Sequence, residues 1–137
     1  MGQYWKPVNL TKREFIDPHK LGTGLKLLEQ SSSSSIASAL VILLAAMPQR
    51  RGGGDFQNNP FIGRWAGDMV LLAGDYAHDD DMPSSPIPFR YVYSLTHGED
   101  IVDDVTGATY KAFTDVTDDV LEIMQSEGMI DPAEQPF

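Results

Sequence analysis

The chain has 137 residues, no cysteine and a formal net charge of −10. This length suffices for one domain around a single core, and the missing cysteine excludes disulfides, thiol nucleophiles and Cys-ligated metal sites. The acidity argues against general nucleic-acid binding, because neutralising phosphates needs a basic surface.

No segment predicts a membrane span or a signal peptide. The longest apolar stretch, 36–47, would extend about 18 Å as a helix, which is short of the roughly 30 Å hydrocarbon layer. The first six residues lack the apolar centre of a signal peptide. We therefore expect a soluble, cytoplasmic protein that contacts neither membrane nor nucleic acid.

The charge is divided unevenly along the chain. Residues 1–51 carry seven lysines and arginines against three acids, a net charge of +4. Residues 52–137 carry three against 17, a net charge of −14. An acidic surface favours solubility and basic partners, although the two halves can also complement each other within one fold.

The N-terminal segment predicts a β-hairpin. Residues 3–10 are rich in aromatic and β-branched side chains, and 14–16 look extended after a short polar turn. Pro7 cannot donate a ladder hydrogen bond, so we expect the first strand to be an edge strand or to bulge there. After a loop rich in Pro and Gly, residues 25–30 fit either a short strand or one or two helical turns.

The next segment predicts a buried helix. Residues 36–47 are apolar except for Ser38, a pattern typical of a helix covered on most sides, and Pro48 ends it. The five serines before it, 31–35, indicate a flexible linker or surface loop whose last member, Ser35, caps the helix.

A central strand is predicted over 68–74. The apolar run from Met69 to Ala73 has a Gly-Asp pair on each side, which is typical of a strand buried on both faces. Loops are predicted around it: a flexible one at 49–59 and an acidic, proline-rich one at 78–88. Residues 89–95 fit either a strand or a short helix.

An amphipathic helix is predicted over 118–126. Thr117 can cap its N-terminus and Gly128 follows its C-terminus. Val120, Leu121 and Met124 share one face, so that face packs against the core. Residues 129–137 are expected to form a loose tail.

These elements predict one α+β domain over residues 1–137. A small, mostly antiparallel sheet, built from the hairpin and the 68–74 strand, packs against the 36–47 helix. The 118–126 helix covers part of the same core. No internal repeat and no second domain are indicated.

Two motifs in the chain resemble a known family. MGQYWK at 1–6 runs into VNLTKRE at 8–14, and GRWAGD at 63–68 precedes AGDYA at 73–77. Together they resemble a family of small uncharacterised proteins found in microbes, including bacteria and fungi. The resemblance implies a shared fold. It implies no activity and carries over no catalytic residue.

The candidate ligand-binding or interface residues flank the 68–74 strand: Arg64, Trp65, Asp68, Asp75 and Tyr76. Trp65 and Tyr76 fit an aromatic pocket, or the core with their polar tips paired. Asp68 and Asp75 stand seven residues apart, about 23 Å along a strand and on opposite faces, which weighs against one carboxylate site. Arg64 fits a pocket or a salt bridge to a nearby acid.

Neither a metal nor a cofactor is expected. A calcium loop counted from Asp75 would need glycine at position 80 and glutamate at 86, where Asp80 and Pro86 stand. A solvated acidic loop is therefore the simpler interpretation of the possible ligands Asp75, His78, Asp79 and Asp81. Residues 22–24 lack the third glycine of a dinucleotide fingerprint and read as a turn.

The functional hypothesis from these patterns is a non-enzymatic acidic protein that binds or regulates a basic protein, as inhibitors and immunity proteins do. It depends on the acidic second part and on the lack of a complete catalytic motif. A small enzyme or ligand-binder with one pocket around the five candidate residues is the first alternative. A structural or assembly component is the second. The catalytic residues and the oligomeric state stay open.

Overall fold

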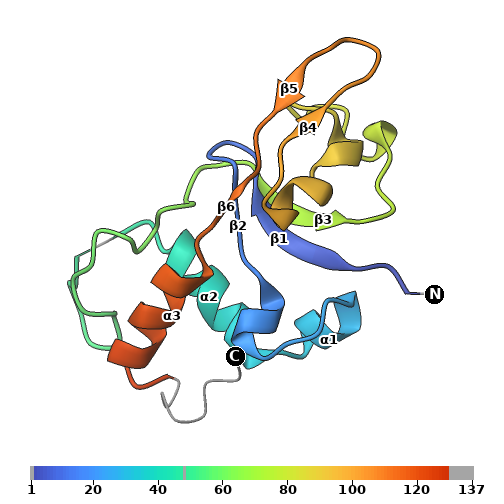
Figure 1. Ribbon diagram of the computed structural model, residues 1–137. Helices are drawn as coiled ribbons and strands as arrows, with labels where there is room; N and C mark the ends of the chain where they lie inside the picture. The colour runs from blue at the N-terminus through green and yellow to red at the C-terminus, as the bar shows by residue number, and fades with distance from the viewer. Residues whose placement is uncertain (1, 48, 130–137) are drawn as a thin grey trace.

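A computed structural model of the chain describes residues 2–47 and 49–129. Its main feature is a four-stranded sheet in the order β3-β1-β2-β6 (Figure 1). The strands are β1 (Trp5–Asn9), β2 (Glu14–Phe15), β3 (Val70–Gly74) and β6 (Thr114–Asp115). Two of the three pairings are antiparallel, and β6 joins β2 in parallel. The α+β fold with a small, mostly antiparallel sheet is therefore confirmed.

The N-terminal hairpin is confirmed, but the expected place of its first strand is wrong. β1 lies between β3 and β2 instead of at an edge. Pro7 is tolerated there because its nitrogen faces β2, where its carbonyl accepts from the Ile16 nitrogen at 3.0 Å. The ladder to β2 pairs only Val8 and Asn9 of β1, whereas the ladder to β3 runs over all five residues.

β3 is an edge strand, so the expected central strand buried on both faces is wrong. Only Ala73 and Gly74 are buried, and Leu72 is 38% exposed. The apolar run packs on one side against β1, but no strand of the described residues pairs with its other side. Local hydrophobicity could not distinguish this edge from a central position.

The predicted helix at 36–47 is observed as α2 (Ser34–Leu44), two residues earlier at its start and three at its end. Ser33, not Ser35, caps it by accepting from the Ile36 nitrogen. Its burial is one-sided, because Val41 is 56% exposed. The expectation of a helix covered on most sides is therefore wrong.

The five-serine run is not a linker. Ser31 ends α1 (Leu27–Ser31), and Ser34 and Ser35 begin α2. The alternative of helical turns after residue 25 is thus the correct one. The preceding loop contains a 3₁₀ helix, η1 (Pro18–Leu21), that ends at Gly22 with a left-handed φ of 74°.

The C-terminal helix is confirmed as α3 (Thr117–Ser126), with Val120, Leu121 and Met124 buried. The expected cap is wrong: Thr117 lies inside the helix, and the Asp115 carboxylate accepts from the Thr117 nitrogen at 2.8 Å. The predicted tail, apart from Met129, lies outside the described residues.

The remaining segments are short. Residues 78–97 contain three 3₁₀ helices, η2 (Asp79–Asp81), η3 (Phe89–Tyr91) and η4 (Ser94–His97), and a separate hairpin pairs β4 (Ile101–Val102) with β5 (Thr109–Tyr110). The loop at 49–59 holds no helix or strand. Within the described ranges, no helix is long and apolar enough to cross a membrane.

Two apolar clusters pack on opposite faces of the sheet. The helix-side cluster joins α2, α3 and η1 and includes Ile16, Leu43 and Trp65. The loop-side cluster joins η3, η4 and the other sheet face and includes Val8 and Leu95. Side chains alternate between faces along a strand, so β1 and its neighbours contribute to both clusters. Figure 1 shows α2 and α3 together, away from the β4–β5 hairpin.

Candidate functional site

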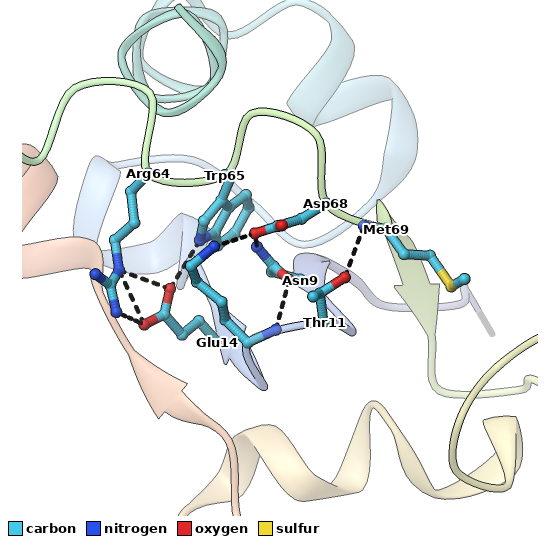
Figure 2. Close-up of polar contacts among 8 residues, drawn as sticks. Asn9, Thr11, Glu14, Arg64, Trp65, Asp68 and Met69 are labelled. Carbon is cyan, nitrogen blue, oxygen red and sulfur yellow. Dashed lines mark hydrogen bonds and ion pairs between the residues drawn. The ribbon is translucent and has the colours of Figure 1, made fainter. Parts of the chain in front are cut away.

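Arg64 and Trp65 converge on one buried carboxylate, that of Glu14 in β2. The Arg64 Nε lies 3.0 Å from both oxygens of Glu14, and the Trp65 Nε1 donates to Oε1 at 2.9 Å. Figure 2 shows both side chains reaching from the 61–69 segment to this carboxylate. Trp65 is fully buried and Glu14 is 5% exposed. The hydrogen bonds that the Arg64 guanidinium donates to Glu14 raise the pKa of Arg64.

Asp68 binds the turn of the N-terminal hairpin. Its carboxylate accepts from the Asn9 side-chain amide at 2.8 Å and from the Lys12 ammonium at 2.5 Å. These two hydrogen bonds, together with the positive charges of Lys12 and Arg64, hold the pKa of Asp68 below its ordinary value of 3.8. The neighbouring Met69 nitrogen donates to the Thr11 hydroxyl (Figure 2).

The chain between α2 and β3 is shaped to present these side chains. Gly63 has a left-handed φ of 80°, which a residue with a Cβ adopts only with strain. Its nitrogen donates to the Ile42 carbonyl at 2.8 Å, and the Trp65 nitrogen donates to the Leu43 carbonyl at 2.9 Å. The segment therefore caps the end of α2 while it points Arg64 and Trp65 at the hairpin.

This polar network joins three parts of the fold. Its carboxylates already accept charged or buried donors, and Trp65 fills the helix-side cluster. Such an arrangement fixes the hairpin, the 61–69 segment and α2 relative to one another, and leaves little capacity to hold a ligand. The contacts of Arg64, Trp65 and Asp68 therefore hold the hairpin, the 61–69 segment and α2 together.

Asp75 and Tyr76 lie at the other end of β3. The Asp75 carboxylate accepts from the Tyr4 nitrogen at 2.9 Å, and the Tyr76 nitrogen donates to the Gln3 side chain at 3.2 Å. Both residues are exposed, Tyr76 by 53%. The structure thus divides the five candidates between the two ends of a strand and does not place them around one pocket.

A cavity of about 500 Å³ lies beside Tyr76. Apolar and aromatic side chains line most of it, and Asp81 supplies its single charge. The lining residues are Gln3, Trp5, Leu71, Leu72, Gly74, Tyr76, Ala77, Asp81, Met82 and Phe89. The Asp81 carboxylate accepts from the His78 nitrogen, which orients η2 beside the cavity. This cavity is the candidate binding site.

Glu14 was missed by sequence reasoning. Arg64 was expected to pair, if at all, with one of the acids near it in the acidic part, but its partner stands fifty residues upstream. No local pattern around Glu14 marks it, because a polar residue in a short strand usually faces solvent. Glu14 is buried where β2 pairs with β6 and where Arg64 and Trp65 reach it from the 61–69 segment.

Lys6 was also missed. It is 6% exposed, donates to the Thr96 hydroxyl at 3.0 Å and lies 5.1 Å from the centre of the Tyr93 ring. Burial lowers the pKa of Lys6, while Asp17 and Asp115 oppose the shift. Its position in a strand beginning with aromatic residues was the only signal available from the sequence.

Two carboxylates of the acidic loop have partners within the fold: Asp79 pairs with Arg90, and Asp81 accepts a hydrogen bond from the His78 nitrogen. Over the residues that the structure describes, no group of three or more histidines and acids gathers in a way that could hold a metal ion.

Comparisons with known proteins add no identification: no family model, no curated protein and no solved structure matches the chain. The resemblance to the microbial family therefore stays a prediction.

Proposed function

We propose that the chain is a non-enzymatic acidic protein that binds a basic protein partner and regulates it, in the manner of an inhibitor or immunity protein. The observation that carries this proposal is a surplus of exposed carboxylates. In the described residues of the acidic part, 52–129, seven exposed acids belong to no ion pair: Asp75, Asp80, Asp81, Glu99, Asp104, Asp119 and Glu122.

The cations of the acidic part cannot neutralise this surplus. Arg64 is bound to Glu14, Arg90 to Asp79 and Asp103, and Lys111 to Asp100. From the basic part, Lys12 pairs with Asp68, and Lys20 pairs with Asp115 and Asp118, so the two parts complement each other at these contacts but not at the seven exposed acids. Exposed charges of one sign attract an oppositely charged surface, speed its approach and weaken in effect as salt rises.

The test is capture by the immobilised full chain at several salt concentrations. We expect a basic protein to be retained at low salt and released as ionic strength rises. A variant with amides at the seven exposed acids should lose this partner. The control carries Ser84→Ala and Ser94→Ala, exposed changes in the same segments that leave the charge unaltered.

Two outcomes would contradict the proposal. One is a partner whose affinity does not fall with salt, and the other is retention by the amide variant equal to that by the control. A discrete oligomer on sizing chromatography, with no retained partner, would favour an assembly component.

A further inference from the structure

The free edge of β3 carries unpaired backbone groups. The Asp75 nitrogen donates to the Tyr4 carbonyl, and the Leu10 nitrogen donates to the Met69 carbonyl. In an antiparallel ladder these bonds alternate, so the odd-numbered residues of β3 face β1 and the even-numbered ones face outward. Within the described ranges, neither Val70 nor Leu72 makes a backbone hydrogen bond on that outward side.

The candidate cavity runs along this edge. Leu71 and Leu72 both line it, although successive side chains of a strand point to opposite faces. A space that touches both faces lies at the rim of the strand. The cavity therefore opens where the N–H and C=O groups of Leu72 point.

A second cavity, of about 480 Å³, adjoins the first through Leu72. It lies against α1 and α2 and is lined by apolar side chains with a few neutral polar ones, including Leu28, Ile36 and Leu40. Leu28 is 84% exposed. Leu72 thus separates two hollows, one aromatic with a single acid and one apolar.

The usual protection of an edge strand is missing here. Edge strands generally carry a charge, a proline or a bulge that prevents pairing with another chain. Val70–Gly74 contains no charged residue and no proline, and its ladder to β1 is continuous. An edge of this kind is a template for an added strand.

The charges beside the edge select the occupant. Asp75, Asp80 and Asp81 are exposed at its C-terminal end, and no lysine or arginine lines either cavity. A second copy of this chain would bring another net charge of −10 to the same surface, which disfavours self-pairing. A basic extended segment meets opposite charge instead.

We propose that the outer edge of β3 binds an extended basic segment of the protein partner as an additional strand. This inference rests on the proposed function and says which surface of the chain the basic partner contacts. The segment's backbone pairs with Leu72. Its apolar side chains enter the hollow beside Leu28 and Leu40, and its lysine or arginine side chains lie along Trp5, Tyr76 and Asp81.

The experiment compares labelled peptides by fluorescence anisotropy with the full chain. An eight-residue peptide alternating lysine and valine should bind, and its affinity should fall as salt rises. A peptide alternating lysine and proline has the same charge but lacks every second N–H donor, so we expect it to bind about tenfold more weakly or less. A peptide alternating glutamate and valine should not bind.

Variants of the chain test the edge directly. Leu72→Pro removes an outward N–H without touching the β1 ladder, and a proline on an edge strand is tolerated where its nitrogen faces solvent. It should lower the affinity for the lysine–valine peptide about tenfold or more, whereas Leu72→Ala keeps the N–H and should lower this affinity less. Because the peptides leave the protein unaltered, they decide the question even if Leu72→Pro fails to fold.

The outcomes separate this inference from the proposed function. If both lysine peptides bound equally and with the same dependence on salt, strand addition would be overturned, but the proposal of a basic partner would still stand. If none of the peptides bound, strand addition would be overturned, and the proposed function would then be tested by the capture experiment alone. Equal binding of the glutamate peptide would overturn the basic occupant. A dimer dissociated by Leu72→Pro would assign the edge to a second copy.

Discussion

Glu14 is the residue on which the 61–69 segment depends. Its carboxylate satisfies the buried Trp65 Nε1 and the Arg64 guanidinium together. Removing Arg64 leaves the buried Glu14 charge without its cation, so we expect Arg64→Leu to lower the free energy of unfolding by about 3 to 5 kcal/mol. Removing Glu14 leaves the Arg64 side chain, which is 40% exposed, to water, but it leaves the buried Trp65 Nε1 without an acceptor, so we expect Glu14→Leu to cost about 1 to 3 kcal/mol.

A double-mutant cycle in urea measures the coupling between them. The double variant should lose clearly less than the sum of the single losses, because neither charge is then left without its partner. Lys111→Ala, in a pair exposed on both sides, is the control and should have a much smaller effect. Additive losses at Glu14 and Arg64 would contradict the structural role assigned to the network.

The carboxylate of Asp68 should make the free energy of unfolding depend on pH. Its pKa in the folded chain is lowered by Asn9 and Lys12, so the unfolded chain binds the proton more tightly. The carboxylate's contribution is therefore present above the unfolded value of about 3.8 and is lost as pH falls through the folded pKa. Asp68→Asn should lower the free energy of unfolding at neutral pH, with a difference that shrinks below about pH 4.

Urea unfolding of both chains between neutral and acidic pH checks this expectation at constant salt. Asp104→Asn changes an exposed carboxylate outside every ion pair of the described ranges and should leave neutral-pH stability nearly unchanged. If the difference in free energy of unfolding between wild type and Asp68→Asn stayed constant down to the lowest pH, the Asp68 carboxylate would not be stabilised by Asn9 and Lys12 as described.

At the scale of elements, Gly63 is the residue of the 61–69 segment that lies against the end of α2. A Cβ on Gly63 would lie 2.3 Å from the Ala45 carbonyl oxygen, whereas one on Gly67 would meet no atom within 4 Å. Both have left-handed φ, 80° and 82°. Gly67→Ala should therefore cost only the strain of that backbone, about 1 to 2 kcal/mol. Gly63→Ala should cost about 1 to 3 kcal/mol more, because backbone must shift.

Thermal and urea unfolding of the two alanine variants give the comparison. The pair is matched in residue type and backbone conformation, so the difference isolates the approach of Gly63 to α2. Equal losses would mean that the end of α2 adapts without cost.

Local sequence patterns predicted which helices and strands form better than they predicted which of them lie beside one another. The hairpin follows from its aromatic and β-branched residues, and α3 follows from the apolar face formed by Val120, Leu121 and Met124, so both signals stand within the segments themselves. The end of α2 does not, because its last carbonyls are taken by Gly63 and Trp65, some twenty residues downstream. The edge position of β3 likewise depends on which strands pair with β1, which hydrophobicity alone does not encode.

The same limit explains the candidate site. Arg64 and Trp65 were recognisable as unusual beside an apolar run, and they do share a partner. Glu14 could not be assigned to them, because the contact requires the hairpin to fold against the 61–69 segment. The cavity at Tyr76 was equally hidden, since its walls come from β1, β3 and the 76–89 region.

At the scale of the whole molecule, the sheet couples the two apolar clusters. Leu43 in the helix-side cluster and Leu95 in the loop-side cluster are both fully buried. β1 contributes residues to one cluster and supports strands that contribute to the other, so loss of either cluster removes a support of the sheet. We predict one cooperative unfolding transition for the described fold.

Leu43→Ala and Leu95→Ala test the coupling. Each should lower the free energy of unfolding by about 2 to 5 kcal/mol through the cavity it creates. Methyl NMR signals from both clusters, followed in urea, should vanish at a common midpoint, and each variant should move that midpoint for both sets of signals. If Leu95→Ala lowered the midpoint of the loop-side signals alone, the two faces of the sheet would be independent units.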